Sequence, residues 1–130
     1  MTMKTKNISP PTAPVATLWD RLGIVGSTLC LIHCAATPLF VGVFSVAGFN
    51  FLGGEQFHQI AALLLALVAF FAFMPGFRRH RNGWVFGAGA LGVLLLIVGG
   101  FAVSSLEGLE VAVTVMGSLL LVTAHMVNWR

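Results

Sequence analysis

The sequence predicts an all-α membrane protein, a bundle of four transmembrane helices with the N- and C-termini in the cytoplasm. Hydrophobic residues make up 58% of the 130 residues and charged residues only 8%, whereas charged residues supply about a quarter of an ordinary soluble domain. Long apolar runs, each near the ~20 residues that cross a bilayer, fill the chain after a polar start. No separate extramembrane domain fits in the remaining length, so we expect the lipid bilayer as a partner and no nucleic acid.

Four apolar runs define the predicted helices. Residues 1–17 contain Ser, Pro and Lys without apolar periodicity, which predicts a disordered cytoplasmic tail. Residues 18–130 are expected to form one transmembrane domain. Its spans are predicted at about residues 22–48, 57–77, 84–103 and 109–129. Because only short connections separate them, neighbouring spans should run antiparallel.

The basic residues predict the orientation of the bundle. They lie before the first span, between the second and third spans, and at the end of the fourth: Lys4, Lys6, Arg21, Arg78, Arg79, Arg81 and Arg130. The other two connections contain no Lys or Arg and carry Glu55, Glu107 and Glu110. Because cytoplasmic loops carry the excess of Lys and Arg, both termini and the central loop are expected in the cytoplasm.

Small and polar side chains share one face of the first predicted helix. At about 100° per residue they fall within a sector of about 120°, and they are Gly23, Gly26, Ser27, Cys30, His33, Cys34 and Thr37. At a rise of about 1.5 Å per residue, Cys30 lies about 15 Å from Asp20, half of a ~30 Å hydrocarbon core. The two thiols and His33 are therefore expected near the bilayer midplane, where an ionisable residue suggests function.

Cys30 and Cys34 form a candidate metal site. Their β-carbons are expected roughly 5 to 6 Å apart, too far for an unstrained disulfide, but two metal–sulfur bonds of about 2.3 Å can bridge them. Thiolates select soft ions, so the pattern favours mercury, copper(I), zinc or cadmium, with His33 as an auxiliary ligand or proton acceptor. Metal binding should then release protons from the thiols. Inert packing of two small apolar side chains is the alternative.

Further polar residues are candidates for an ion pathway. On the first predicted helix the candidates are Thr37 and Pro38. Pro38 cannot donate the backbone hydrogen bond that the Cys34 carbonyl would accept, so a kink there would expose this oxygen beside the thiols. A proline kink that serves only helix packing is the alternative. The fourth predicted helix carries a polar stripe of Thr114, Ser118, His125 and Asn128. If it faces the first helix, this stripe extends a polar path inward. Hydrogen bonding that only holds the helices together explains the stripe equally well.

Two other features are not assigned to the predicted metal site. His58, with Glu55 one turn before it, is placed to attract a cation at the outer mouth of the second span, but a solvated histidine at the interface is the favoured interpretation. The cluster around His80 is interpreted as a topology anchor. No carboxylate is evident to orient His33 or His125, as a nucleophile and its base would need, so the sequence does not predict an enzyme.

Four segments carry a resemblance to a known family: Asp20–Gly23, Ser27–Cys34, Arg79–Arg81 and Gly117–Arg130. In these segments the chain resembles the MerC family, small four-span membrane proteins associated with mercuric-ion uptake in bacteria. The resemblance implies that Cys30 and Cys34 accept mercuric ion within the inner membrane and that a cytosolic thiol or reductase receives it. The two cysteines are spaced by three residues and no later cysteine follows, so the chain is similar to the broader MerC-like branch.

Together these observations predict a multi-pass transporter of the bacterial inner membrane that moves a soft metal ion into the cytoplasm. Mercuric ion is the ligand that the resemblance implies, and no cofactor is expected. A cytosolic metal acceptor is an expected partner, and a homo-oligomer remains an open alternative. The rival hypothesis is a non-transporting membrane subunit or a thiol redox sensor.

Overall fold

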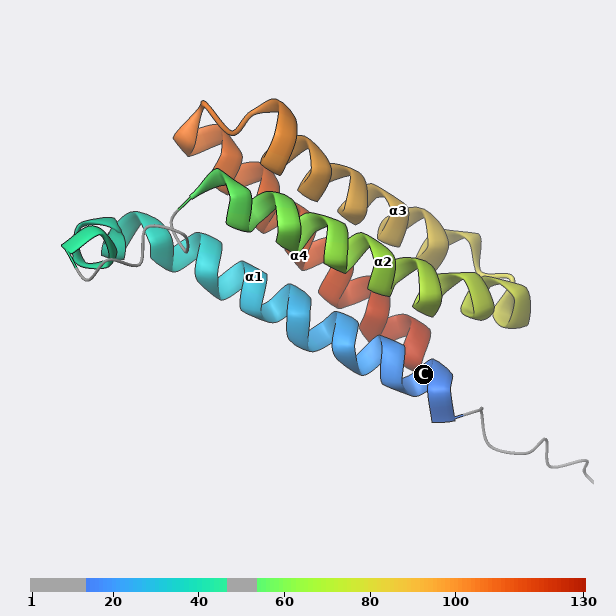
Figure 1. The fold of residues 1–130 in the computed structure, drawn as a ribbon. Coiled ribbons are helices and arrows are strands. Elements are labelled where there is room, and N and C mark those ends of the chain that lie inside the picture. The colour runs from blue at the N-terminus through green and yellow to red at the C-terminus, as the bar shows by residue number, and fades with distance from the viewer. Residues whose placement is uncertain (1–13, 47–53) are drawn as a thin grey trace, which may run out of the picture.

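Four long helices make up the fold, which was obtained as a computed structural model (Figure 1). It describes residues 14–46 and 54–130, and the side chains of the first helix over residues 18–37. The helices are α1 (Pro14–Val46), α2 (Glu55–His80), α3 (Gly83–Ile97) and α4 (Glu107–Trp129), and a π-helical turn, η1 (Val98–Ala102), continues α3. The prediction of an all-helical chain with four helices is confirmed.

The first helix begins eight residues before its predicted span, and the other three begin one or two residues before theirs. α1 begins at Pro14, so the last four residues of the predicted tail are helical; proline suits a first helical position because its missing N–H has no intrahelical partner there. The remaining tail, residues 1–13, and the end of the first predicted span, residues 47–48, lie outside the described residues. Between α2 and α3 the chain turns at Arg81, whose φ of 48° is left-handed, and the Asn82 side chain caps α3 by accepting from the Trp84 backbone N–H at 3.2 Å.

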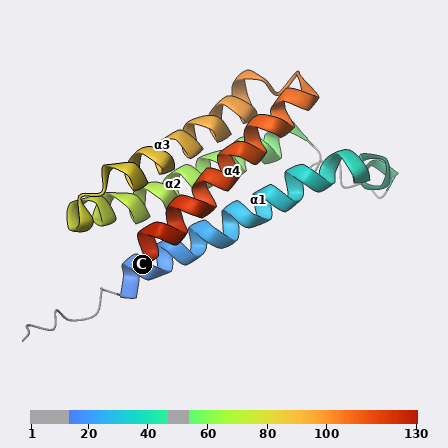
Figure 2. The ribbon, with the colours of Figure 1, turned by 180° about the vertical axis from the view of Figure 1, so that it is seen from behind.

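Successive helices alternate in direction, as the views from opposite sides show (Figures 1 and 2). α4 packs against both α1 and α3, α2 also packs against both, and no contact joins α1 to α3 in the described part of the chain. The start of α1, the α2–α3 turn and the C-terminus therefore lie at one end of the bundle. We call this the basic end, because Arg21, Arg78, Arg79, Arg81 and Arg130 belong to it. The opposite end, where α2 and α4 begin with Glu55, Glu107 and Glu110, is called the acidic end.

The outer surface of the bundle is apolar. Three helical stretches are long and apolar enough to cross a membrane: Glu55–Arg79, Gly83–Ala102 and Gly108–Trp129, with mean hydropathies of 2.4, 2.3 and 1.7. Large side chains are exposed on every helix, among them Val25, Leu29, Ile32, Leu64, Phe70, Leu94, Met116 and Leu119. A continuous apolar surface of this kind marks contact with lipid rather than water. The chain is a membrane protein.

Glycines allow the backbones of α3 and α4 to approach each other closely. A β-carbon added at Gly92 would lie 3.0 Å from the Gly117 carbonyl oxygen, and one added at Gly117 would lie 2.9 Å from the Gly92 carbonyl oxygen. Small residues permit such backbone approach in membrane helices, where no hydrophobic force drives association. With α4 held against α3 in this way, its opposite face is turned to α1.

Candidate metal site

A buried polar seam runs between α1 and α4. On α1 the buried positions recur every three or four residues and are Asp20, Gly23, Ser27, Cys30 and Cys34. This spacing places them along one stripe of a helix. On α4 the buried polar residues are Thr114, Ser118 and His125. The structure thus places the polar face of the first helix against the polar stripe of the fourth.

The two thiols lie next to each other in this seam. Cys30 is 9% exposed and Cys34 only 1%, both are free, and their sulfur atoms are 3.8 Å apart. Cys30 neighbours Ser118, halfway along α4, whereas Cys34 neighbours Thr114, one turn closer to the acidic end. Cys34 is therefore the thiol that meets the residues at the start of α2 and α4.

Two histidines approach Cys34 from different helices. The Nε2 atom of His58, in the first turns of α2, is 3.8 Å from the Cys34 sulfur. The ligand atoms of His33, Cys34 and His58 all lie within 4.8 Å of one another, a spacing that can hold a metal ion. The His33 ring packs against Phe57, with ring centroids 4.4 Å apart. Of the three metal ligands predicted from sequence, His33 therefore joins Cys34 and His58, and Cys30 is connected to this group through the Cys34 sulfur.

His58 is not a solvated interfacial residue, and that interpretation is wrong. Its side chain is only 11% exposed, and its Nδ1 atom lies 2.6 Å from a carboxylate oxygen of Glu110, which is 12% exposed. Both residues lie one turn into their helices at the acidic end. The alternating helix directions bring these two helix starts to the same end of the bundle. His58 and Glu110 are each the second residue of a predicted span, and this shared position was the available sequence signal for the pair.

A second polar cluster closes the seam at the basic end. Asp20 is 3% exposed, and one of its oxygens lies 3.0 Å from Nδ1 of His125. The Asn128 side-chain amide donates to both Asp20 oxygens, at 3.1 and 3.0 Å, and to the Ala72 carbonyl at 3.2 Å. We call Asp20, His125 and Asn128 the basic-end cluster. It connects α1, α2 and α4.

The His125 ring is packed on two sides. The ring stacks on Phe73 with centroids 4.4 Å apart. The part of the ring around Nε2 fills the space above Gly23, where an added β-carbon would be too close to the ring for any side chain. The expectation that no carboxylate orients His125 is wrong, because Asp20 is drawn into the bundle instead of remaining at the interface.

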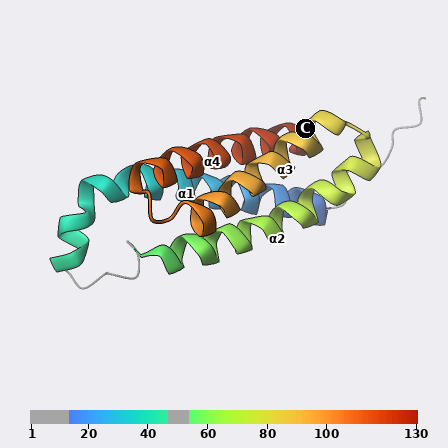
Figure 3. The ribbon, with the colours of Figure 1, turned by 90° about the horizontal axis from the view of Figure 1, so that it is seen from above.

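The other predicted pathway residues divide into three groups. Ser118, like Ser27 on α1, is fully buried, and neither hydroxyl has a hydrogen-bond partner in the described part of the chain. The Thr37 hydroxyl donates to the His33 carbonyl oxygen at 2.7 Å and is thus engaged with its own helix. Pro38 lies within α1, but its side chain is outside the described residues. The last turns of α1 bend away from the bundle (Figure 3).

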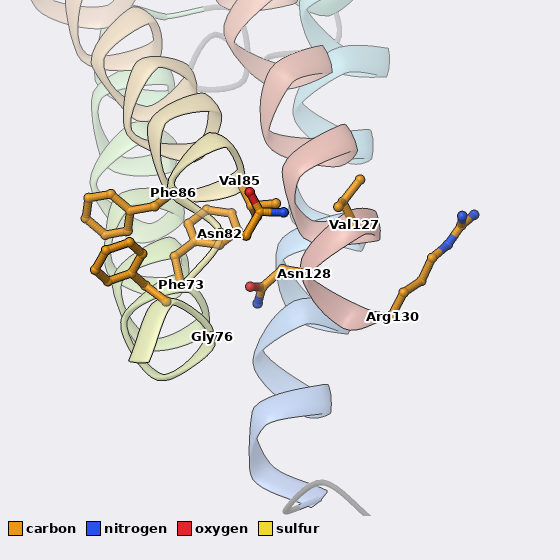
Figure 4. A pocket seen from close by; sticks show the side chains of 9 residues that line it. Phe73, Gly76, Asn82, Val85, Phe86, Val127, Asn128 and Arg130 are labelled. Atoms are coloured by element: carbon orange, nitrogen blue, oxygen red, sulfur yellow. The ribbon is translucent and has the colours of Figure 1, made fainter. Parts of the chain in front are cut away.

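A cavity of about 250 Å³ opens at the basic end (Figure 4). Its lining includes Phe73, Gly76, Asn82, Val85, Asn128 and Arg130. Asn128 both lines this cavity and holds Asp20, so the cavity adjoins the basic-end cluster. The seam thus extends from the thiols, past two buried hydroxyls, to a cluster bordering an open cavity.

Comparison with known proteins identifies the family. The model of a family described as MerC mercury resistance protein matches residues 20–130. No curated protein and no solved structure matches the chain. The matched region begins at Asp20 and includes every seam residue described above, from the basic-end cluster to the thiols. The chain therefore belongs to the MerC mercury resistance family.

Proposed function

We propose that this membrane protein is a transporter that binds a soft metal ion at Cys30 and Cys34 and moves it into the cytoplasm. Membership of a mercury resistance family makes mercuric ion the expected cargo. The observation that carries the proposal is the pair of buried free thiols, with sulfurs 3.8 Å apart, in the polar seam of an otherwise apolar bundle. Two metal–sulfur bonds of about 2.3 Å can bridge such a pair.

The chemistry of the thiols favours a soft cargo. Thiolate ligands select soft cations over magnesium or calcium. Each thiol loses its proton when it binds the ion, so loading a divalent cation on two thiolates leaves the loaded site without net charge. A neutral site is the form best suited to the low-dielectric interior of a membrane.

The orientation of the transporter follows from its charged ends. We take α1 as a fourth span beside the three apolar helices. Because Lys and Arg are enriched in cytoplasmic loops, the basic end then lies on the cytoplasmic side of a bacterial inner membrane. The acidic end then faces outward.

The seam supplies a route from the thiols to the cytoplasm. From Cys30 the next polar groups inward are the hydroxyls of Ser27 and Ser118, and then the basic-end cluster. That cluster fills the seam where it reaches the basic-end cavity, so the ion leaves only when Asp20, His125 and Asn128 separate. A cytosolic thiol is the expected acceptor beyond this point.

Metal accumulation in bacteria tests the proposal. Cells carrying the vector alone, the wild-type protein, or the Cys30→Ser, Cys34→Ser double variant at equal membrane abundance are exposed to mercury, zinc, copper and cadmium. Elemental mass spectrometry then measures each metal. Excess mercury in the wild type that disappears in the double variant supports transport. Equal mercury in all three strains contradicts it and favours a redox sensor or a non-transporting subunit.

A further inference from the structure

The start of α2 presents an imidazole to the thiol site in the way metal-binding proteins present a ligand. One nitrogen of His58 is directed at the Cys34 sulfur, at 3.8 Å, and the other lies 2.6 Å from Glu110. In metal sites a ligating histidine usually has its second nitrogen held by a carboxylate, a carbonyl or water, which fixes the ring orientation. His58 has this arrangement with α1 on one side and α4 on the other.

We propose that His58, oriented by Glu110, binds metal together with Cys34 and His33, and that the thiol site therefore also takes divalent cations of the zinc class. This inference rests on the proposed function only in sharing Cys34. Thiolates alone favour the softest ions, whereas imidazole suits zinc, copper, iron and nickel. Adding one or two imidazoles to a thiol site broadens its selectivity toward ions that take three or four ligands.

The two donor distances that involve the Cys34 sulfur are close to those of a tetrahedral site. With tetrahedral angles and bonds of about 2.3 Å to sulfur and 2.0 to 2.1 Å to nitrogen, two sulfurs lie about 3.8 Å apart and a sulfur and a nitrogen about 3.6 Å apart. The Cys30–Cys34 and Cys34–His58 distances are both 3.8 Å. A linear two-coordinate ion with the same bond length needs sulfurs about 4.6 Å apart. The thiols must therefore separate to hold a linear ion, but not to hold a tetrahedral one.

Two further donors, His33 and Cys30, lie near the Cys34–His58 pair. His33 belongs to the group whose ligand atoms lie within 4.8 Å of one another, and Cys30 contacts Cys34 directly. His33 supplies the third ligand, and water or Cys30 the fourth. Cys30 lies outside the group of donor atoms within 4.8 Å, so it joins the site only when its side chain moves toward the ion.

The backbone of the first turn of α2 packs against η1. Gly100, in η1, lies against the backbone of His58 and Gln59, where an added β-carbon would be 3.5 Å from both. π-Helical turns often occur at functional sites. The alternative role for the His58–Glu110 pair is to fasten α2 to α4 without binding metal, as interhelical polar pairs do in many membrane proteins.

Cobalt(II) titration of the full-length protein in detergent micelles distinguishes the two roles. Cobalt(II) substitutes for zinc, and its visible absorption bands are intense only in four-coordinate sites, while thiolate ligands add charge-transfer bands in the near ultraviolet. Zinc affinity follows from competition against bound cobalt. The variants are His58→Gln and Glu110→Gln. Their matched controls are His80→Gln, at the other end of α2, and Glu55→Gln, an exposed carboxylate at the same end as Glu110.

The proposal predicts that His58→Gln weakens zinc and cobalt binding at least tenfold and changes the intensity of the visible bands. Glu110→Gln, which removes the partner of a ligand, is expected to weaken binding about 10- to 100-fold. The two controls should bind as the wild type does. Circular dichroism of each metal-free variant checks that it is folded. Metal affinities are compared only between proteins whose circular dichroism spectra match that of the wild type.

Two results overturn the proposal. One is unchanged cobalt and zinc affinity in His58→Gln, with loss of binding in the Cys30→Ser, Cys34→Ser variant; this leaves the thiol transporter intact. The other is a stability loss in His58→Gln with an affinity equal to that of the wild type, which assigns the pair to helix fastening. Failure of the proposed function has a different signature, namely thiol-independent mercury accumulation in cells, whatever the cobalt spectrum shows.

Discussion

The two ends of the seam between α1 and α4 use the same pair of residue types in opposite ways. Each has a histidine beside a carboxylate: His125 with Asp20 at the basic end, and His58 with Glu110 at the acidic end. The His125 ring is stacked on Phe73 and packed over Gly23. The second nitrogen of His58 faces a thiol instead. A carboxylate–histidine pair therefore indicates a ligand only where the histidine's other nitrogen faces a donor or a space that can hold an ion.

The basic-end cluster and the thiol site also differ in the strength of their hydrogen bonding. The basic-end cluster is joined by bonds of 3.0 to 3.2 Å, with Asn128 donating to three acceptors. The thiol site is held by two contacts of 3.8 Å to sulfur, which are weak. A satisfied polar network stabilises one structure, whereas weakly paired thiols lose little when an ion replaces their contacts. We infer that the basic-end cluster contributes mainly to the stability of the fold and the thiol site mainly to metal binding.

Removal of Asp20 should produce the largest loss of stability. Asp20→Ala leaves His125 without its carboxylate partner and Asn128 with only the Ala72 carbonyl, and each buried polar group left without its partner costs about 1–3 kcal/mol. Thermal unfolding followed by circular dichroism in detergent measures the effect. Asp20→Asn keeps an acceptor oxygen and should lose less. Equal unfolding temperatures for the wild type and Asp20→Ala would show that the cluster is not what stabilises this end.

A methyl group at Gly23 should disturb the same cluster from the other side. Gly23→Ala places a β-carbon inside the volume of the His125 ring, so the ring must leave its position beside Asp20. Such overpacking typically costs about 1–3 kcal/mol. Gly87→Ala, where an added β-carbon meets no atom within 4 Å, is the matched control. An unfolding temperature of Gly23→Ala equal to that of Gly87→Ala would contradict the packing described for His125.

Single thiol variants should separate the roles of the two cysteines. Cys34 contacts both Cys30 and His58, whereas Cys30 contacts Cys34. Cys34→Ser should therefore weaken zinc and cobalt binding about tenfold more than Cys30→Ser, a difference of about 1.4 kcal/mol. Competition titrations measure both affinities. If the two variants lose the same affinity, Cys34 is not the shared ligand.

The smallest effect is expected at Gly100. Its β-carbon in Gly100→Ala would meet the backbone of α2 at 3.5 Å, an ordinary van der Waals distance. Alanine is the better helix former by up to about 1 kcal/mol, so the variant should be as stable as the wild type or slightly more so. Zinc affinity should not change. A loss of stability or affinity would mean that the start of α2 must approach η1 more closely than this geometry indicates.

The helices were predictable from sequence because membrane spans are defined by composition and length alone. The runs ending at Phe77, Val103 and Trp129 end within three residues of the observed helices, since the bilayer length constrains each one locally. The polar face of α1 was equally visible, because Asp20, Ser27 and Cys34 are related by helical periodicity within a single segment. Information of this kind does not depend on other helices.

The pairing of residues between helices was not predictable in the same way. His58 and Glu110 are separated by 52 positions and belong to helices that pack on each other less closely than either packs on α3. Asp20 lies beside Arg21 at the predicted interface, and nothing local indicates that only the aspartate turns inward. Arg21 instead stands over the Trp129 ring, 5.2 Å from its centroid. Which residue faces the interior depends on the rotation of each helix about its own axis, and the packing of the helices sets this rotation.

The central claim is that the thiol pair carries mercuric ion across the membrane, and transport by the purified protein tests it most directly. Wild-type protein and the Cys30→Ser, Cys34→Ser variant are reconstituted at equal density in liposomes that contain a trapped thiol. Mercury is supplied outside as the nitrate, because its neutral chloride crosses lipid unaided. Faster mercury entry with wild-type protein than with either the variant or empty liposomes is the predicted result. Equal rates in all three would contradict the account.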